Sequence, residues 1–347
     1  MSFFSSPLIS WTDKGLYCEA GGFHIDPHRA VDLAVITHAH SDHARRGHKK
    51  YLCVRDGIEL LKTRVGKKIA VEGFAYGEAF ALGDTTVSLH SAGHILGSAQ
   101  VRVQRGNEVW VASGDYKRDR DPSCAPFEVV PCDTFITEAT FGTPQFVWEK
   151  DLEHGRLIHE WWEETAAKGK NCVLFGYSLG KAQRILAELA PFATKPVLIH
   201  STIAELTECY RREGKVLAPT SVLTDVLYYL FDSEELRGEL ILAPPSILRE
   251  GWASKLGRFE TAFASGWMTP GGFGFNRYDR GFVMSDHADW DDLNLTIRQS
   301  GAHRVFVQHR EGELIRHLRK SGIDAHHVEQ LRVDNYTSLG GTVLKLL

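Results

Sequence analysis

The distribution of apolar residues divides the chain near residue 150. Up to that point the apolar runs are short and separated by glycine, proline, aspartate or asparagine, which is the pattern of β-strands joined by turns. It predicts strands at residues 15–19, 23–25, 31–37, 85–90, 101–103, 108–112 and 134–137, with a short helix at 58–65. The first part of the chain is therefore expected to be rich in β-sheet.

From Leu152 onward helical and strand patterns alternate. The pattern predicts helices at 152–168, 180–189 and 203–212, and apolar strands at 171–175, 195–199, 239–243 and 261–264. Such alternation is typical of a largely parallel sheet covered by helices. The chain is then expected to finish with a strand at 304–307, a helix at 313–321 and a strand at 342–346.

A cluster of metal-ligand residues follows the strand predicted at 31–37. It reads His38-Ala39-His40-Ser41-Asp42-His43. His38 and His40 are two residues apart, so in extended backbone their side chains point to the same side. Imidazole and carboxylate in this mixture are typical of a hydrolytic zinc site rather than a Cys-rich structural one. The alternative is a histidine-rich surface loop.

Other candidate ligands stand just after predicted apolar strands. They are Asp26, His94, Asp115 and Glu138. Each alone also fits a turn or capping residue, but their recurrence after the histidine cluster indicates a site built at the strand ends of an α/β sandwich. Further polar segments, residues 285–289 and 308–311, follow apolar runs late in the chain.

Composition limits the class of protein. The 347 residues are 43% hydrophobic and 24% charged, as in a soluble globular protein, with no apolar run of about 18 residues that would cross a membrane. The N-terminus has no secretory signal pattern, and the six cysteines form no C-x-x-C pair, which favours a cytoplasmic location. A net charge of −4 argues against non-specific coating of nucleic acid but allows a local basic rim.

The segment 176–181 superficially resembles a P-loop. Three residues, not four, separate its glycines, and Ala182 stands where serine or threonine is needed, so the sequence does not predict an ATP site. A loop entering a helix could still hold a substrate phosphate. The candidate phosphate contacts are Ser178, Lys181, Arg184, Arg249, Arg277 and Arg310, although each alone also fits an ordinary surface residue.

Seven motifs in chain order resemble those of a known family. They are Asp26, residues 38–43, His94, Asp115, Glu138, residues 285–289 and His309. The first four resemble the motifs of the metallo-β-lactamase fold, and the last three resemble those added in the β-CASP nucleases, a group that includes ribonuclease J and the Artemis-type enzymes. Within this group the chain is similar to the exonucleases associated with bacterial DNA ligases.

The resemblance implies an α/β fold in two domains. A four-layered αββα metallo-β-lactamase sandwich would comprise residues 1–169 and 271–347, and an inserted α/β β-CASP domain would comprise residues 170–270. The implied cofactors are two Zn²⁺ ions, with Mn²⁺ or Fe²⁺ also compatible. His38, His40, His94 and Asp115 would hold the first ion, and Asp42, His43, His309 and Asp115 the second.

The same resemblance implies phosphodiester hydrolysis. A hydroxide shared by the metals would attack phosphorus, His287 would protonate the leaving oxygen as general acid, Glu138 would orient His287, and Asp26 would fix a ligand histidine. DNA is favoured over RNA as substrate, with an exonuclease role in repair and a DNA ligase or helicase repair system as an implied partner.

Three alternatives remain open at this point. An RNA-processing nuclease is favoured by His309, because Artemis-type DNA enzymes usually have valine there. The last motif also reads His309-Arg310-Glu311 where the family commonly has His-Gly-Glu. A non-catalytic scaffold and a small-molecule metallo-hydrolase are the other two, and the complete ligand set and the inserted segment argue against them.

Overall fold

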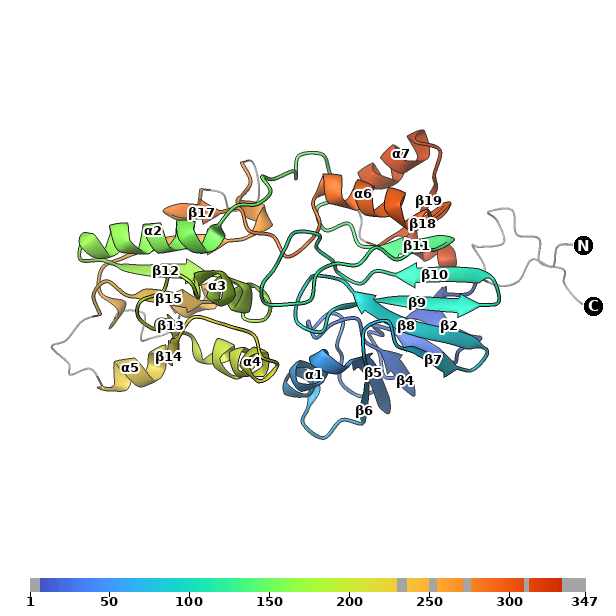
Figure 1. The fold of residues 1–347 in the computed structure, drawn as a ribbon, viewed down its shortest axis with the longest axis horizontal. Helices are drawn as coiled ribbons and strands as arrows, with labels where there is room; N and C mark the ends of the chain where they lie inside the picture. Colours follow the sequence, from blue (N-terminus) through green and yellow to red (C-terminus); the bar gives the residue numbers. More distant parts are fainter. Residues whose placement is uncertain (1–6, 230–235, 250–254, 271–275, 309–311, 333–347) are drawn as a thin grey trace, which may run out of the picture. The chain divides into compact units, whose positions relative to one another are not determined.

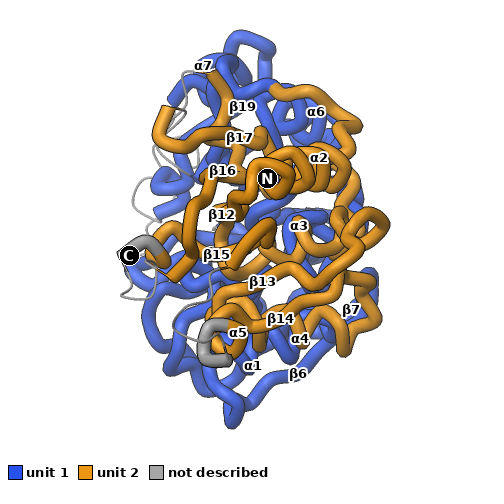
Figure 2. Tube along the Cα trace, turned by 90° about the vertical axis from the view of Figure 1, so that its left-hand side faces the viewer, with its two compact units in different colours: residues 1–118, 126–147, 288–347 blue, residues 119–125, 148–287 orange. Residues whose placement is uncertain are grey.

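The structure is a computed structural model that describes residues 7–229, 236–249, 255–270, 276–308 and 312–332. The chain forms two compact units (Figure 2). The first comprises residues 1–118, 126–147 and 288–347, and the second comprises residues 119–125 and 148–287.

The first unit contains two β-sheets (Figure 1). One has the order β1-β2-β3-β4-β5-β6, with bounds Ser10–Thr12, Gly15–Cys18, Phe23–Ile25, Leu33–Val35, Lys50–Val54 and Val71–Phe74. The other has the order β19-β18-β11-β10-β9-β8-β7, with bounds Asp324–His327, Arg304–Val307, Thr134–Thr137, Glu108–Ala112, Ala99–Arg105, Thr85–Ser91 and Ala79–Leu82.

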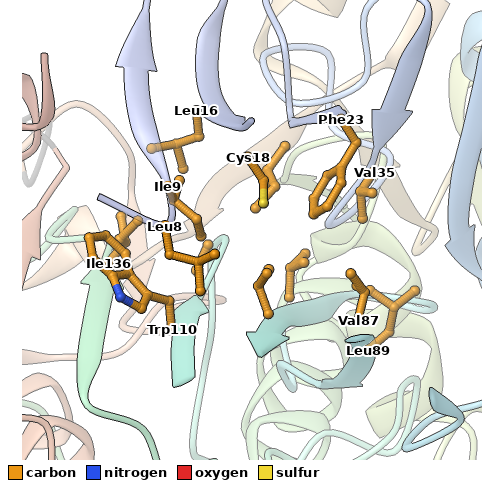
Figure 3. Packing of buried hydrophobic residues seen from close by; sticks show 14 of the residues in the cluster. Leu8, Ile9, Leu16, Cys18, Phe23, Val35, Val87, Leu89, Trp110 and Ile136 are labelled. Carbon is orange, nitrogen blue, oxygen red and sulfur yellow. The ribbon is translucent and has the colours of Figure 1, made fainter. Parts of the chain in front are cut away.

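The two sheets enclose one apolar core, because alternate residues of each strand point inward. Val87 and Leu89 of β8 are fully buried and meet Phe23 and Val35 from the first sheet (Figure 3). The same core takes in Trp110 of β10.

Helices cover the outer faces of both sheets. Helix α1 (Ile58–Val65) packs its Leu61 on the outward-facing Ala34, the neighbour of inward-facing Val35. Helices α6 (Trp290–Ser300) and α7 (Gly312–Lys320) pack on the outer face of the second sheet. The 3-10 helix η5 (Val328–Leu331) instead places Val328 and Leu331 in the core between the sheets. The predicted αββα sandwich is therefore confirmed.

The second unit is a parallel sheet with helices on both faces. Its order is β14-β13-β15-β12-β16-β17, with bounds Thr220–Val222, Val197–Ile199, Leu240–Ala243, Asn171–Phe175, Phe259–Ala264 and Arg280–Phe282. Its helices are α2 (His154–Ala167), α3 (Lys181–Leu189), α4 (Ser201–Arg212) and α5 (Leu223–Tyr229). Leu174 of β12 faces α2 and α3, whereas Val173 faces α5.

The bounds of the second unit differ from those of the predicted insert at 170–270. Helix α2 joins this unit because its apolar residues Trp161 and Trp162 pack against the parallel sheet. Residues 119–125 join it as well, and Asp121 lies 3.8 Å from the guanidinium of Arg184 in α3. A helix at the edge of an insert carries no sequence signal for the sheet on which it packs.

Several elements also differ from the predicted ones. The strand expected at 31–37 is hydrogen-bonded as a strand only over Leu33–Val35. Among the described strands and α-helices, those that the sequence did not predict are β1, β5, β6, β7, β14, β17, β19, α5 and α6. The strand predicted at 342–346 lies outside the described residues. Among the described helices, none has the length and apolar character that crossing a bilayer requires.

Candidate metal centre

The histidine cluster follows strand β4. The backbone between β4 and the cluster is hydrogen-bonded to two other strands, β5 and β9. The amide of Ile36 donates to Leu52 O at 2.8 Å, and the amide of Ala99 donates to Thr37 O at 2.8 Å. Beyond His38 the chain turns, and the amide of His43 donates to His40 O at 3.1 Å. Because of this turn, the candidate ligands His38, His40 and His43 are close in sequence but approach the site from different directions.

Four side chains converge there with the spacing of a metal site. His40 Nδ1 lies 3.1 Å from His38 Nε2 and 3.1 Å from His94 Nε2. Asp115 Oδ2 lies 3.5 Å from His38 Nε2 and 3.8 Å from His94 Nε2. Zinc–ligand bonds of roughly 2.0–2.2 Å put the corners of a tetrahedron about 3.3–3.6 Å apart. The four atoms therefore fit one divalent ion of this kind.

A second group of ligands shares Asp115 with the first. His43 Nε2 lies 3.4 Å from Asp115 Oδ2 and 3.7 Å from Asp42 Oδ2. His43 is thus near two carboxylates, and imidazole and carboxylate are ligand types that a second divalent ion would accept. His309, which the sequence assigns to this ion, lies outside the described residues.

Asp26 orients two of the ligand histidines. Its Oδ2 accepts from His43 Nδ1 at 2.7 Å, so that Nε2 points toward Asp115. The same oxygen accepts from the Thr37 hydroxyl at 2.5 Å, and Thr37 Oγ1 lies 3.0 Å from His38 Nδ1. A carboxylate or hydroxyl behind a ligand histidine fixes its ring and its tautomer. These are the contacts through which Asp26 would fix a ligand histidine, the role predicted for it.

The buried histidines have opposite electrostatic settings. Burial, together with the neighbouring His43, holds the pKa of His38 well below its usual value. Burial also lowers the pKa of His43, but the carboxylates of Asp115 and Asp26 outweigh it and leave that pKa well above the usual value. At neutral pH His38 therefore presents a neutral imidazole, the form that binds metal, whereas His43 would have to release a proton before it could bind one.

The sequence suggested no role for two residues that shape this centre. Thr37 connects Asp26 to His38, and Ser98 Oγ accepts from the amides of His94 and Ile95 at 3.1 and 3.2 Å. A hydroxyl residue beside or four residues from a ligand is too common a pattern to be recognised without the fold. Gly114 was visible only as the neighbour of Asp115, although its backbone packs directly on Thr37.

Glu138 lies at the end of β11 with its carboxylate buried. Its Oε1 accepts from the amide of Tyr116 at 2.7 Å, the residue after the shared ligand Asp115. An oxygen of Glu138 also lies within 4.8 Å of an oxygen of Asp115. The carbonyl of the same Tyr116 accepts from the amide of Ala288 at 2.7 Å.

His287 is the last residue of the second unit and is half-buried. Its amide donates to Ser285 Oγ at 3.0 Å, and that hydroxyl donates to His287 O at 2.9 Å. The next residue, Ala288, belongs to the first unit and carries the bond to Tyr116 just described.

The candidate phosphate contacts do not behave alike. Lys181 and Arg184 are buried and their charged groups bond to protein partners, contrary to the prediction that they contact phosphate, because α3 turns this face into the unit. Ser178 is half-buried and its Oγ lies 3.1 Å from Thr202 Oγ1, and Arg277 is exposed. Arg310 lies outside the described residues, as does the side chain of Arg249.

A cavity of about 640 Å³ lies beside the second ligand group in the first unit. Asp26, Asp42, His43 and Gly114 line it on the ligand side, and Trp11 and Gln308 are among the other residues around it. A small ligand in this cavity would contact Asp42 and His43, whereas the side chains of His38 and His94 are buried in the protein.

The sandwich, with ligands gathered at its strand ends, places the chain in the metallo-β-lactamase class of folds. A protein named "Probable DNA ligase" from Opitutus terrae is 32% identical over 330 residues, covering 94% of this chain and 31% of that protein. An "RNase J-like protein" from Methanocaldococcus jannaschii is 25% identical over 224 residues, covering 55% of this chain and 53% of that protein.

The chain thus spans less than two thirds of the length of either relative. A solved structure of a protein of unknown function from Enterococcus faecalis shares the fold, with a TM-score of 0.55 and 13% identity over 86% of this chain and 81% of that one. The chain matches no protein-family model. It belongs to the β-CASP family of the metallo-β-lactamase fold.

Proposed function

We propose that this chain is a phosphodiesterase that uses two divalent metal ions to cleave nucleic acid, and that it acts as a DNA exonuclease in repair. The observation that carries the proposal is the paired ligand set around Asp115. One carboxylate oxygen stands 3.5 Å from His38 in the first group and 3.4 Å from His43 in the second. A carboxylate that lies between two sets of candidate ligands could serve two adjacent ions.

His38, His40, His94 and Asp115 would hold one ion, and Asp42, His43, Asp115 and His309 the other. When bound, a pair of ions such as Zn²⁺, Mn²⁺ or Fe²⁺ activates water and stabilises negative charge on a phosphoryl group. Asp26 and Thr37 would hold the ligand rings in the orientation that binding these ions needs.

His287 is the proposed general acid that protonates the leaving oxygen. A half-buried imidazole on a loop can both reach a substrate and exchange its proton. Glu138 is the proposed orienting residue, and its bond to Tyr116 links it to the residue whose carbonyl holds Ala288.

The choice of DNA rests on one relative. The protein named as a probable DNA ligase matches nearly the whole of this chain. An RNA-processing nuclease is the second candidate, favoured by the match to the RNase J-like protein and by His309 in the sequence.

The proposal is tested with 5′- and 3′-labelled single- and double-stranded DNA and RNA, with metal content measured on the same sample. We expect stepwise release of nucleotides from DNA ends. Asp115→Asn should reduce cleavage by at least about a hundredfold without unfolding, because it weakens both ligand groups at once. Cleavage of RNA alone would support the second candidate, and no cleavage of either by metal-loaded protein would overturn the proposal.

A further inference from the structure

A cluster of buried charges lies against the segment that precedes His287, entirely within the second unit. Lys181 and Arg184 are one turn apart at the start of α3 and share a face. Lys181 Nζ donates to Asp286 Oδ1 at 2.7 Å and also to the carbonyl of Met284. The side chains of Lys181 and Asp286 are 2% and 8% exposed.

Arg184 extends the cluster in both directions. Its Nη1 donates to the carbonyl of Ser285 and lies 3.6 Å from Asp286 Oδ1. Its Nε donates to Glu188 Oε1 at 2.9 Å and lies 3.8 Å from Asp121 Oδ2. The two cations are thus matched by carboxylates, which is the condition for burying charge at all.

The contacts fall on three successive residues of one loop. Side chains of α3 donate hydrogen bonds to the carbonyl oxygens of Met284 and Ser285 and to the carboxylate of Asp286. Ser285 Oγ then holds the backbone of His287 on both its amide and its carbonyl. On the other side, the amide of Ala288 donates to Tyr116 O at 2.7 Å. The residues on both sides of His287 in the sequence, Asp286 and Ala288, are therefore each held by a hydrogen bond.

A buried ion pair is weak evidence for stability, because desolvation offsets most of the attraction. An apolar helix face would hold α3 in place at least as well. The charged side chains add a defined geometry, because a hydrogen bond fixes a carbonyl or a carboxylate at a preferred distance and angle, whereas apolar contact does not. The cluster therefore fits a need to fix one loop accurately.

We propose that Lys181, Arg184 and Asp286 are positioning residues that hold the His287 loop in the geometry for proton transfer. This inference rests on the proposed function. As an oxygen of water bonds to phosphorus and gives up a proton, the bond between phosphorus and the leaving oxygen breaks, its electron pair stays on that oxygen, and the proton of His287 goes to it. A general acid contributes about 10²–10⁴-fold to a rate, and a displacement of about 1 Å can cost about 10²-fold of that.

The test compares two substrates that differ in their need for a proton. When DNA is cleaved, the leaving oxygen is an alkoxide that must receive a proton. Thymidine 5′-(p-nitrophenyl phosphate) releases p-nitrophenolate, which is stable without a proton. For Asp286→Asn, which keeps the shape of the side chain and removes its charge, we expect kcat to fall by about 10–100-fold on DNA. On the nitrophenyl ester we expect a change of about threefold or less.

Lys181→Met should show the same selective loss, and Lys181→Arg, which keeps the charge, should recover most of the rate on DNA. The matched control is Lys195→Met, which removes a half-exposed ion pair with Glu239 in the same unit. Lys195 lies at the amino end of β13, whereas the buried cluster lies at the carboxyl ends of the strands of that sheet. It should leave both rates unchanged. Circular dichroism, melting curves and metal content are measured for every variant.

Equal losses on both substrates by a folded, metal-loaded Asp286→Asn variant would overturn the inference, and so would unchanged rates on both. Should Asp286→Asn fail to fold, the contrast between Lys181→Met and Lys181→Arg decides in the same way. Failure of the proposed function is seen separately, because wild-type protein would then not cleave DNA, or His287→Ala would cleave it normally.

Discussion

Asp26 has a left-handed backbone, with φ of 44°, at the point where its carboxylate must reach both Thr37 and His43. Aspartate and asparagine are the non-glycine residues that tolerate this region best. The strain is thus located where one side chain orients two ligand histidines, as expected for backbone outliers at functional sites.

Asp26→Asn should therefore keep the backbone but weaken the orientation of His43 and His38. We expect metal affinity and cleavage to fall by about 10–100-fold, the usual effect of losing such a partner. Titration of metal-free protein with Mn²⁺ measures the affinity. Asp32→Asn, at an exposed aspartate paired with Lys49, is the control. Equal affinities for Asp26→Asn and wild type would contradict the assigned role.

Gly114 precedes the shared ligand and offers a second residue-scale test. A Cβ built there, at φ of 55°, would lie 2.7 Å from Thr37 Cβ. At Gly106, with φ of 58°, a Cβ would meet nothing within 4 Å. Both alanine variants carry the same backbone strain of about 1–2 kcal/mol.

Only Gly114→Ala adds a clash, of about 1–3 kcal/mol, and displaces Thr37. We expect it to unfold at a lower denaturant concentration than Gly106→Ala and to bind metal more weakly. Chemical denaturation of the two variants measures the difference. Similar unfolding free energies would show that the glycine is not needed for packing against Thr37.

At the scale of elements, the alternation that predicted a strand at residues 85–90 matches β8 almost to its ends, whereas β9 has seven residues and only 101–103 were predicted. The strands β6 and β7 are partly exposed over most of their length, so their pattern was too weak to predict them. Helix α6 was not predicted either, because Asp289, whose side chain accepts from the amide of Asp292 at its start, was interpreted only as part of a motif.

Strand β8 provides the test of the sandwich core. Leu89 is fully buried between the sheets, whereas Thr86 on the same strand is exposed. Leu89→Ala should lower the free energy of unfolding by about 2–5 kcal/mol. Thr86→Ala should lower it by no more than about 1 kcal/mol, the range of strand propensities. Urea unfolding gives both values, and equal losses would contradict the inward direction of Leu89.

At the scale of the whole molecule, the sequence predicted the class of fold and most candidate ligands, since ligands at strand ends are close to apolar runs. It could not predict that Lys181 and Arg184 are internal. Their burial depends on the face that α3 turns toward residues 284–286, which lie about a hundred positions along the chain. The DNA preference, the metal identity and the cytoplasmic location remain predictions.

The central claim is that two ligand groups sharing Asp115 bind two metal ions and that both are needed for cleavage. It is tested most directly by titrating chelator-treated protein with Mn²⁺ while following the cleavage of labelled DNA and the bound metal on one sample. The account predicts that cleavage is absent without metal and reaches its maximum at two ions per chain. Full cleavage with chelator present, or a plateau at one ion per chain, would contradict it.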